Sequence, residues 1–218
     1  MKIRFFFLNL CALLALNNYA YSKDVIELFN GPLNAYYTKH YSGKNIIKKV
    51  VSDKNEHIIT HISDHSASGL FQKININLKE KQMNYLNFEW KVKKIKNIDE
   101  TKKEYHDFPA RIYLTFKSGL FPWNRYYVNY VFSVTQFKGT HWKSPYLNIF
   151  TKSYDVALNG VGDPEEYWIK HKIDLSSDLN KFWNIDTYQL ESVAIMVDTD
   201  NTKTKTTTSF KNIYLSQY

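Results

Sequence analysis

The sequence predicts an all-β fold: a single β-sandwich, of jelly-roll or galactose-binding-like type, with one short helix. Apolar and polar residues alternate in several short segments, most cleanly at 86–93 (LNFEWKVK) and 110–117 (ARIYLTFK). A period of two is typical of strands that have one face in a core. Turn residues separate about ten to twelve such segments, and the order of elements shows no βαβ rhythm, so a sandwich is favoured.

In the first half of the chain, strands are expected at 25–29, 45–52, 56–63, 69–78 and 86–93. Asn30-Gly31-Pro32 ends the first strand, and Asp53-Lys54-Asn55 joins the second and third as a hairpin. In the last of these strands the alternation places Leu86, Phe88, Trp90 and Val92 in the core.

In the second half, strands are expected at 107–117, 126–136, 146–152, 154–158, 168–174, 191–198 and 208–215. Ser176-Ser177-Asp178 predicts the N-cap of a helix that ends near Trp183. The strand at 191–198 consists of small and branched residues and is expected to be buried on both faces. Residues 202–206 (TKTKT) favour an exposed loop or an edge strand.

Residues 1–22 are typical of a secretory signal peptide, which leaves one β-sandwich domain at 23–218. Lys2 and Arg4 precede an apolar run, and Ala20-Tyr21-Ser22 is a small-x-small cleavage signal. The run of about 12 apolar residues is shorter than the roughly 20 that span a bilayer. We therefore expect a periplasmic or secreted protein with no stable membrane span after cleavage. An uncleaved anchor is the alternative.

Composition argues against several classes of function. Cys11 is the only cysteine and lies in the signal segment, so the exported chain has no thiolate nucleophile, thiolate metal ligand or disulfide. The formal net charge is +8, but lysines are interleaved with acids, as in Lys79-Glu80-Lys81, and the chain has only three arginines. Nucleic-acid binding requires a concentrated basic patch and is not expected.

Arg111 and nearby acids form the main candidate ligand site. Asp107 precedes Arg111 on the same predicted strand, and Asp198 and Asp200 end a later one. If those strands are neighbours, the guanidinium can bind a carboxylate and leave other polar groups for the hydroxyls of a sugar. Tyr113 could stack on a sugar face. We predict Asp107, Arg111, Tyr113, Asp198 and Asp200 as ligand-binding residues; the alternative is an Arg–Asp bridge with a purely structural role.

Two further features bear on this site. Most aromatic residues are expected in the core, with Trp123, Tyr126, Tyr127 and Trp142 on the loop side. Asp198, Asp200 and Asn201 offer oxygen ligands at a turn, which makes Ca²⁺ a minor possibility. The same residues also favour turns by bonding to their own backbone. No metal or cofactor is expected otherwise.

Several segments together resemble one bacterial family. They are 66–70 (SASGL), 86–92 (LNFEWKV), 107–116 (DFPARIYLTF), Trp168 with Asp174 and Asp178, and 194–202 (AIMVDTDNT). In this order and spacing, from about Phe29 onward, the chain is similar to the exported proteins grouped as domain of unknown function 3047. The resemblance implies a sandwich similar to galactose- or carbohydrate-binding modules, and no established activity.

The chain departs from the pattern of that family at two positions. His106 stands beside Asp107 where the family often has two acids, and Ile173 stands where a basic residue tends to precede the aspartate. Both departures weaken a paired-carboxylate or charge-clamped site.

The sequence predicts an exported ligand-binding protein whose ligand is a glycan or envelope polysaccharide. One alternative is an envelope polysaccharide hydrolase or lyase with Asp107 as acid or base and Arg111 as charge stabiliser. A structural or adhesion protein, which would have no concave site, is another. No G-x-S-x-G nucleophile motif is present, and the residues leave open whether the protein is an enzyme.

Overall fold

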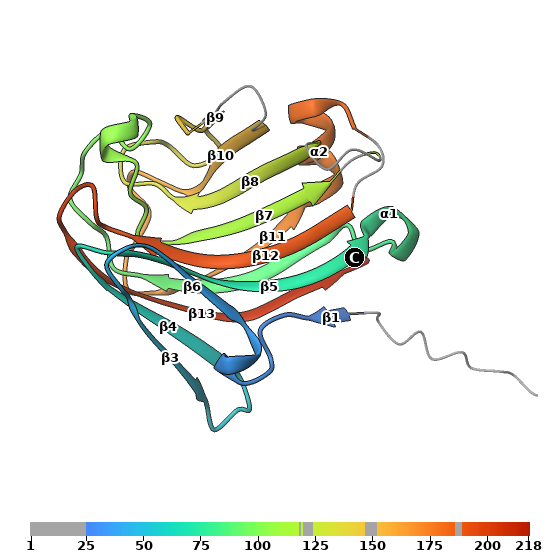
Figure 1. Ribbon diagram of the computed structural model, residues 1–218, viewed down its shortest axis with the longest axis horizontal. Helices are drawn as coiled ribbons and strands as arrows, with labels where there is room; N and C mark the ends of the chain where they lie inside the picture. The colour runs from blue at the N-terminus through green and yellow to red at the C-terminus, as the bar shows by residue number, and fades with distance from the viewer. Residues whose placement is uncertain (1–24, 118, 120–123, 147–151, 186–188) are drawn as a thin grey trace, which may run out of the picture.

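The computed structural model of the protein describes residues 25–117, 119, 124–146, 152–185 and 189–218. Two β-sheets pack face to face with one hydrophobic core between them (Figure 1). Core side chains come from both sheets, among them Trp90, Phe88 and Phe210 from one and Ile112, Leu114 and Tyr130 from the other. The predicted all-β sandwich is confirmed.

The six-stranded sheet has the order β11-β6-β13-β4-β3, with β1 paired to β13. Its strands are β1 (Val25–Glu27), β3 (Ile46–Val51), β4 (His57–Asp64), β6 (Tyr85–Val92), β11 (Trp168–Asp174) and β13 (Lys205–Ser216). The predicted hairpin is confirmed as β3 and β4, which pair antiparallel.

The seven-stranded sheet has the order β2-β5-β12-β7-β8-β10-β9. Its strands are β2 (Tyr37–Ser42), β5 (Ala67–Asn77), β7 (Arg111–Lys117), β8 (Arg125–Phe132), β9 (His141–Lys143), β10 (Lys152–Asn159) and β12 (Gln189–Asp198). The chain crosses between the sheets at each step from β4 to β7 and again from β10 to β13, the alternation typical of a jelly roll. β10 runs parallel to β8.

Two short α-helices and two 3-10 turns complete the described chain. They are α1 (Leu78–Lys81), α2 (Leu175–Trp183), η1 (Leu33–Ala35) and η2 (Lys103–Tyr105). The predicted helix is α2, but its N-cap is Asp174, whose side chain accepts a hydrogen bond from the Ser177 amide at 2.9 Å. Among the described residues, no helix combines the length and apolar character needed to cross a bilayer.

Alternation in β6 and β7 sets the direction of their side chains. Leu86, Phe88, Trp90 and Val92 are at most 1% exposed, as predicted. The last residues of β12 are buried on both faces, also as predicted.

Some predictions failed or fall outside the described chain. Residues 202–204 lie in the turn and loop before β13, as expected, whereas Lys205 and Thr206 begin β13 at a point where it pairs with β4 and has not yet reached its pairing with β6, which starts at Thr208. The pairing of these residues with β4 explains their place in the sheet. Strands β2 and β9 were not predicted. The signal segment at 1–22 and most of the strand expected at 146–152 lie outside the described residues.

Candidate functional site

The outer face of the seven-stranded sheet, opposite the core, carries the polar side chains of β7. Ile112 and Leu114 are fully buried in the core, so Arg111 and Tyr113 point to the other side. The register places Met196 of β12 beside Arg111. The strand neighbours assumed in the sequence-based prediction, β7 and β12, are therefore adjacent.

Arg111 and Asp198 form a buried ion pair on this face. Nη2 of Arg111 donates to Oδ2 of Asp198 at 2.8 Å, and the Phe108 amide donates to Oδ1 at 3.0 Å. The guanidinium carbon lies 4.7 Å from the centre of the Phe108 ring. Burial raises the pKa of Asp198 to about 7, against the opposing effects of Arg111 and the Phe108 amide.

This pair leaves hydrogen-bonding capacity unused. Nε of Arg111 is buried and has no partner among the described residues. On β8, Asn129 donates to Oδ1 of Asp155 at 2.7 Å, while its own Oδ1 is buried without a donor in the described part of the chain. Neighbouring strands β7 and β8 therefore carry an unpaired donor, Nε of Arg111, and an unpaired acceptor, Oδ1 of Asn129. Leaving buried polar atoms without hydrogen bonds lowers the stability of the fold.

His106 is held in place by Asp155 of β10. The His106 Nε2 and Asp155 Oδ2 atoms are 2.8 Å apart, and both side chains are almost completely buried. Burial lowers the pKa of His106, although the hydrogen bond to Asp155 acts to raise it. The contact with Asp155 fixes the orientation of the imidazole ring.

Asp107 has a different environment from the other predicted acids. It is 0% exposed, and its carboxylate accepts hydrogen bonds from the Asn201 amide at 3.2 Å, the Thr202 amide at 2.6 Å and the Thr202 hydroxyl at 2.7 Å. These bonds attach the turn after β12 to the segment before β7. Asp107 does not line the cleft described next.

A cleft of about 460 Å³ lies over this part of the sheet. Its walls combine tyrosines with small polar side chains. The lining includes Tyr41, Tyr113, Tyr127, Tyr146, Arg111, Asn129, Ser144, Ser153, Asp198, Asp200 and Asn201. Burial raises the pKa of Tyr41, Tyr113 and Tyr127, so these phenols stay neutral and keep both a donor and an acceptor.

Four of the five predicted ligand-binding residues meet in this cleft: Arg111, Tyr113, Asp198 and Asp200. Asp200 is half-buried, and burial followed by the nearby Asp107 charge raises its pKa. The Ca²⁺ possibility gains no support at this turn, because Asp198 already pairs with Arg111. In the described residues, no group of three or more His, Cys, Asp or Glu could hold a metal ion.

Of the aromatic residues expected on the loop side, Tyr127 lines the cleft, whereas Tyr126 is 7% exposed and belongs to the core. Alternation in β8 is the reason, because neighbouring residues point to opposite faces. Trp142 lies on β9, and Trp123 is outside the described residues.

Sequence reasoning missed Tyr41, Tyr146 and the pairing of His106 with Asp155. Tyr41 and Tyr146 come from an edge strand and a loop, where no apolar pattern marks them. The alternation at 125–132 does contain a signal, since it places Tyr127 and Asn129 on the same outer face.

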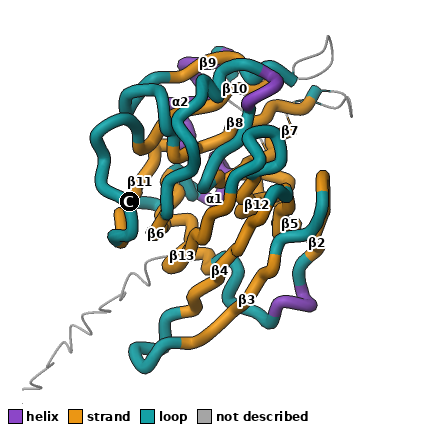
Figure 2. Tube along the Cα trace, turned by 90° about the vertical axis from the view of Figure 1, so that its left-hand side faces the viewer, coloured by secondary structure: helices purple, strands orange, loops and turns teal. Residues whose placement is uncertain are grey.

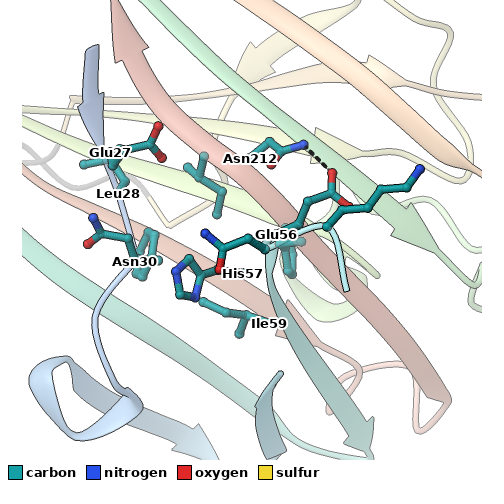
Figure 3. A pocket seen from close by; sticks show the side chains of 12 residues that line it. Glu27, Leu28, Asn30, Glu56, His57, Ile59 and Asn212 are labelled. Atoms are coloured by element: carbon teal, nitrogen blue, oxygen red, sulfur yellow. Dashed lines mark hydrogen bonds between the residues drawn. The ribbon is translucent and has the colours of Figure 1, made fainter. Parts of the chain in front are cut away.

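A second cavity, of about 410 Å³, lies where β1, β4 and β13 meet (Figure 3). One of its charged groups, Glu56, is engaged by neighbouring side chains. Glu56 accepts hydrogen bonds from Lys211 at 2.8 Å and from Asn212 at 3.2 Å, the latter drawn as a dashed line. Nδ1 of His57 is buried without a partner among the described residues. Unlike the cleft over β7 and β8, this cavity is not lined by tyrosines.

Several solved structures are similar to this chain over most of its length. A family 30 carbohydrate-binding module of a cellulosomal cellulase from Clostridium thermocellum is 12% identical, with 88% of this chain and 96% of that chain covered and a TM-score of 0.47. The xyloglucanase domain of a type three effector from Sinorhizobium fredii, in complex with cellobiose, is 8% identical, with 89% and 97% covered and a TM-score of 0.46. These values are too low to indicate a shared function.

No curated protein matches the chain. The family described as Protein of unknown function (DUF3047) matches residues 42–214, which is most of the sequence. That range includes the segments on which the resemblance was based, from 66–70 to 194–202. The chain belongs to the DUF3047 family.

Proposed function

We propose that the protein is an exported glycan-binding protein and that its ligand occupies the tyrosine-lined cleft. The observation that carries this proposal is the combination of Arg111 and Asn129, each with an unpaired buried polar atom, and a wall of neutral tyrosines. A sugar hydroxyl is both donor and acceptor, so it complements both kinds of unpaired atom after small side-chain adjustments.

The tyrosines supply the second half of sugar recognition. The Tyr113 and Tyr127 rings lie 5.6 Å apart at an interplanar angle of 31°, on the same outer face. Rings of this kind offer flat apolar surface together with a polar tip, which suits a pyranose with its C–H faces and its rim of hydroxyls. Ligand sites commonly combine apolar walls with a few well-placed polar groups in this way.

Export to the periplasm or outside the cell is part of the proposal. Its support is the basic, apolar and small-residue pattern of residues 1–22. Expression of the whole chain with a C-terminal tag in a Gram-negative host, followed by N-terminal mass analysis of the periplasmic fraction, tests it. Recovery of the intact chain in the cytoplasm would count against export.

The arrangement gives less support to a hydrolase or lyase that uses Asp107. A general acid or base has to reach the proton it transfers. Asp107 does not line the cleft, and both of its oxygens are engaged by Asn201 and Thr202. A purely structural role predicts no concave site, whereas the described residues form one.

The test is a glycan array followed by calorimetry on the purified protein. Tyr113→Ala and Tyr127→Ala are each expected to weaken binding about tenfold, because each removes one ring contact. Tyr167→Ala is the control, since Tyr167 is 68% exposed and does not line the cleft. Absence of any binding glycan, or equal effects of all three variants, would overturn the proposal. Chromatography of the incubated glycan checks for cleavage.

A further inference from the structure

We propose that the ligand is a linear oligosaccharide or polysaccharide segment that lies across the strands of the seven-stranded sheet, rather than a single sugar. This inference rests on the proposed function and names the length and direction of the ligand. Four aromatic rings carry it: Tyr37 on β2, Phe71 on β5, Tyr113 on β7 and Tyr127 on β8. Their consecutive ring centres are 6.3, 6.2 and 5.6 Å apart. We call these four residues the aromatic row.

Strand register places the first three rings of the row in one line. Tyr37 pairs with Phe71, Phe71 with Ala194 of β12, and Ala194 with Tyr113. Directly opposed residues project to the same side of a sheet. The methyl group of Ala194 is small enough for the Phe71 and Tyr113 rings to meet across it.

Gly69 also shapes this surface. A Cβ at Gly69 would lie 2.7 Å from a ring carbon of Phe71, so the ring can occupy its observed position only because Gly69 has no side chain. Gly69 and Phe71 project to the same face of β5, and Gly69 pairs with Met196 of β12, which lines the cleft. Gly69 and Ala194, both small, therefore leave space for the rings of the row.

Besides the tyrosine-lined cleft, a separate hollow lies at the Tyr37 end of the aromatic row. It measures about 550 Å³ and is bounded by Tyr36, Tyr37, Phe71, Lys73 and Ser192. The Phe71–Tyr113 contact stands between this hollow and the tyrosine-lined cleft. The outer face thus has two recesses joined by aromatic surface.

The length of the row decides between a single sugar and a chain. From β2 to β8 the sheet crosses β5, β12 and β7, so the two end strands lie roughly 19 Å apart at the usual separation of neighbouring strands, and the row extends over nearly that width. Figure 2 shows β7, β12, β5 and β2 following one another along the molecule. That span accommodates several linked sugar rings and is too long for one. Lys73 and Ser192 offer polar groups to the hydroxyls at the far end.

The test uses ladders from monomer to hexamer of four homopolymers: β-1,4-glucan, β-1,4-xylan, chitin and polygalacturonic acid. Calorimetry on the full chain is expected to give affinity that rises at least tenfold from monomer to tetramer in one ladder. Tyr37→Ala and Phe71→Ala are each expected to weaken binding of the hexamer about tenfold and to weaken binding of the shortest bound oligomer much less. Tyr167→Ala, on the side of the other sheet, is the matched control.

The outcomes separate this inference from the proposed function. Equal affinity for monomer and hexamer, with sensitivity to Tyr113→Ala but not to Phe71→Ala, would overturn the chain-length inference and leave glycan binding in the cleft intact. Absence of binding to every ladder would overturn both. Length-dependent binding that is insensitive to Tyr37→Ala and Phe71→Ala would place the chain elsewhere on the protein and overturn the inference.

Discussion

Arg111→Met tests whether the buried pair on β7 and β12 holds the site together. Arg111 is 6% exposed and Asp198 4% exposed, with 2.8 Å between Nη2 and Oδ2. Met fills the space of the aliphatic stem but removes the charge, which leaves Asp198 with the Phe108 amide as its donor among the described residues. Removal of one partner from a buried pair costs about 3–5 kcal/mol, because the other charge stays buried and uncompensated.

This loss is expected to depend on pH. Burial raises the pKa of Asp198 to about 7 even beside Arg111, which acts to lower it, so the pKa rises further in the variant. A carboxyl group with a higher pKa in the folded than in the unfolded chain takes up its proton more readily when folded. Its contribution to stability is therefore fully present at low pH and is lost as pH rises through the folded pKa. The loss caused by Arg111→Met should be smaller at pH 5 than at pH 8.

Urea unfolding followed by intrinsic fluorescence at both pH values measures the effect. Addition of Asp198→Asn to Arg111→Met should recover most of the loss at pH 8, because the buried charge is gone. Arg125→Met is the matched control: Arg125 pairs with Glu191 at 2.8 Å but is 45% exposed in its side chain, so a loss below about 1 kcal/mol is expected. A similarly small loss for Arg111→Met, or equal losses at both pH values, would refute the reasoning.

Three further changes test other parts of the structure. His61 is fully buried on β4 with neither ring nitrogen paired within the described chain, and burial lowers its pKa to about 3. Because neutral His61 stabilises the fold above its ordinary pKa of 6.5, the wild type loses that stability as pH falls towards 3. The free energy of unfolding of His61→Phe, taken relative to wild type, should therefore rise by about 2 kcal/mol from pH 8 to pH 5. A difference that does not depend on pH in urea unfolding would contradict this. Asp107→Asn should destabilise by about 1–3 kcal/mol in thermal unfolding, because its amide group faces backbone donors; an unchanged midpoint would argue against its role in fixing the turn. Gly69→Ala should weaken binding of the hexamer in calorimetry by displacing the Phe71 ring, with circular dichroism unchanged; wild-type affinity would exclude that ring from the contact surface.

The sequence contained enough information to place the centre of the site but not its edges. Alternation at 110–117 correctly separated Ile112 and Leu114 from Arg111 and Tyr113, because a buried face enforces a strict period of two. Strand β2, which carries Tyr37 and Tyr41, was missed for the converse reason. It is an edge strand with exposed residues along most of its length, so no apolar pattern specifies it.

Contacts between residues far apart in the sequence also could not be predicted. Asp107 accepts its hydrogen bonds from a turn more than ninety positions away, and no local pattern distinguishes that role from a role in a site. The pairing of Asn129 with Asp155 depends on the parallel register of β8 and β10. Parallel neighbours require a crossover connection. The sequence pattern within each strand does not predict which strands such a connection brings together.

Structural and ligand-binding roles for Arg111 need not exclude each other. A guanidinium has five N–H donors in a fixed plane, and the pair with Asp198 uses Nη2. The Asp198 carboxylate and the Phe108 ring fix the plane of the group, which restricts where the remaining donors can point. A ligand that binds such a group meets a donor whose conformational entropy has already been lost on folding, and preorganisation of this kind favours affinity. The contacts whose loss is expected to make Arg111→Met destabilising are therefore also the ones that would orient the guanidinium for the proposed ligand.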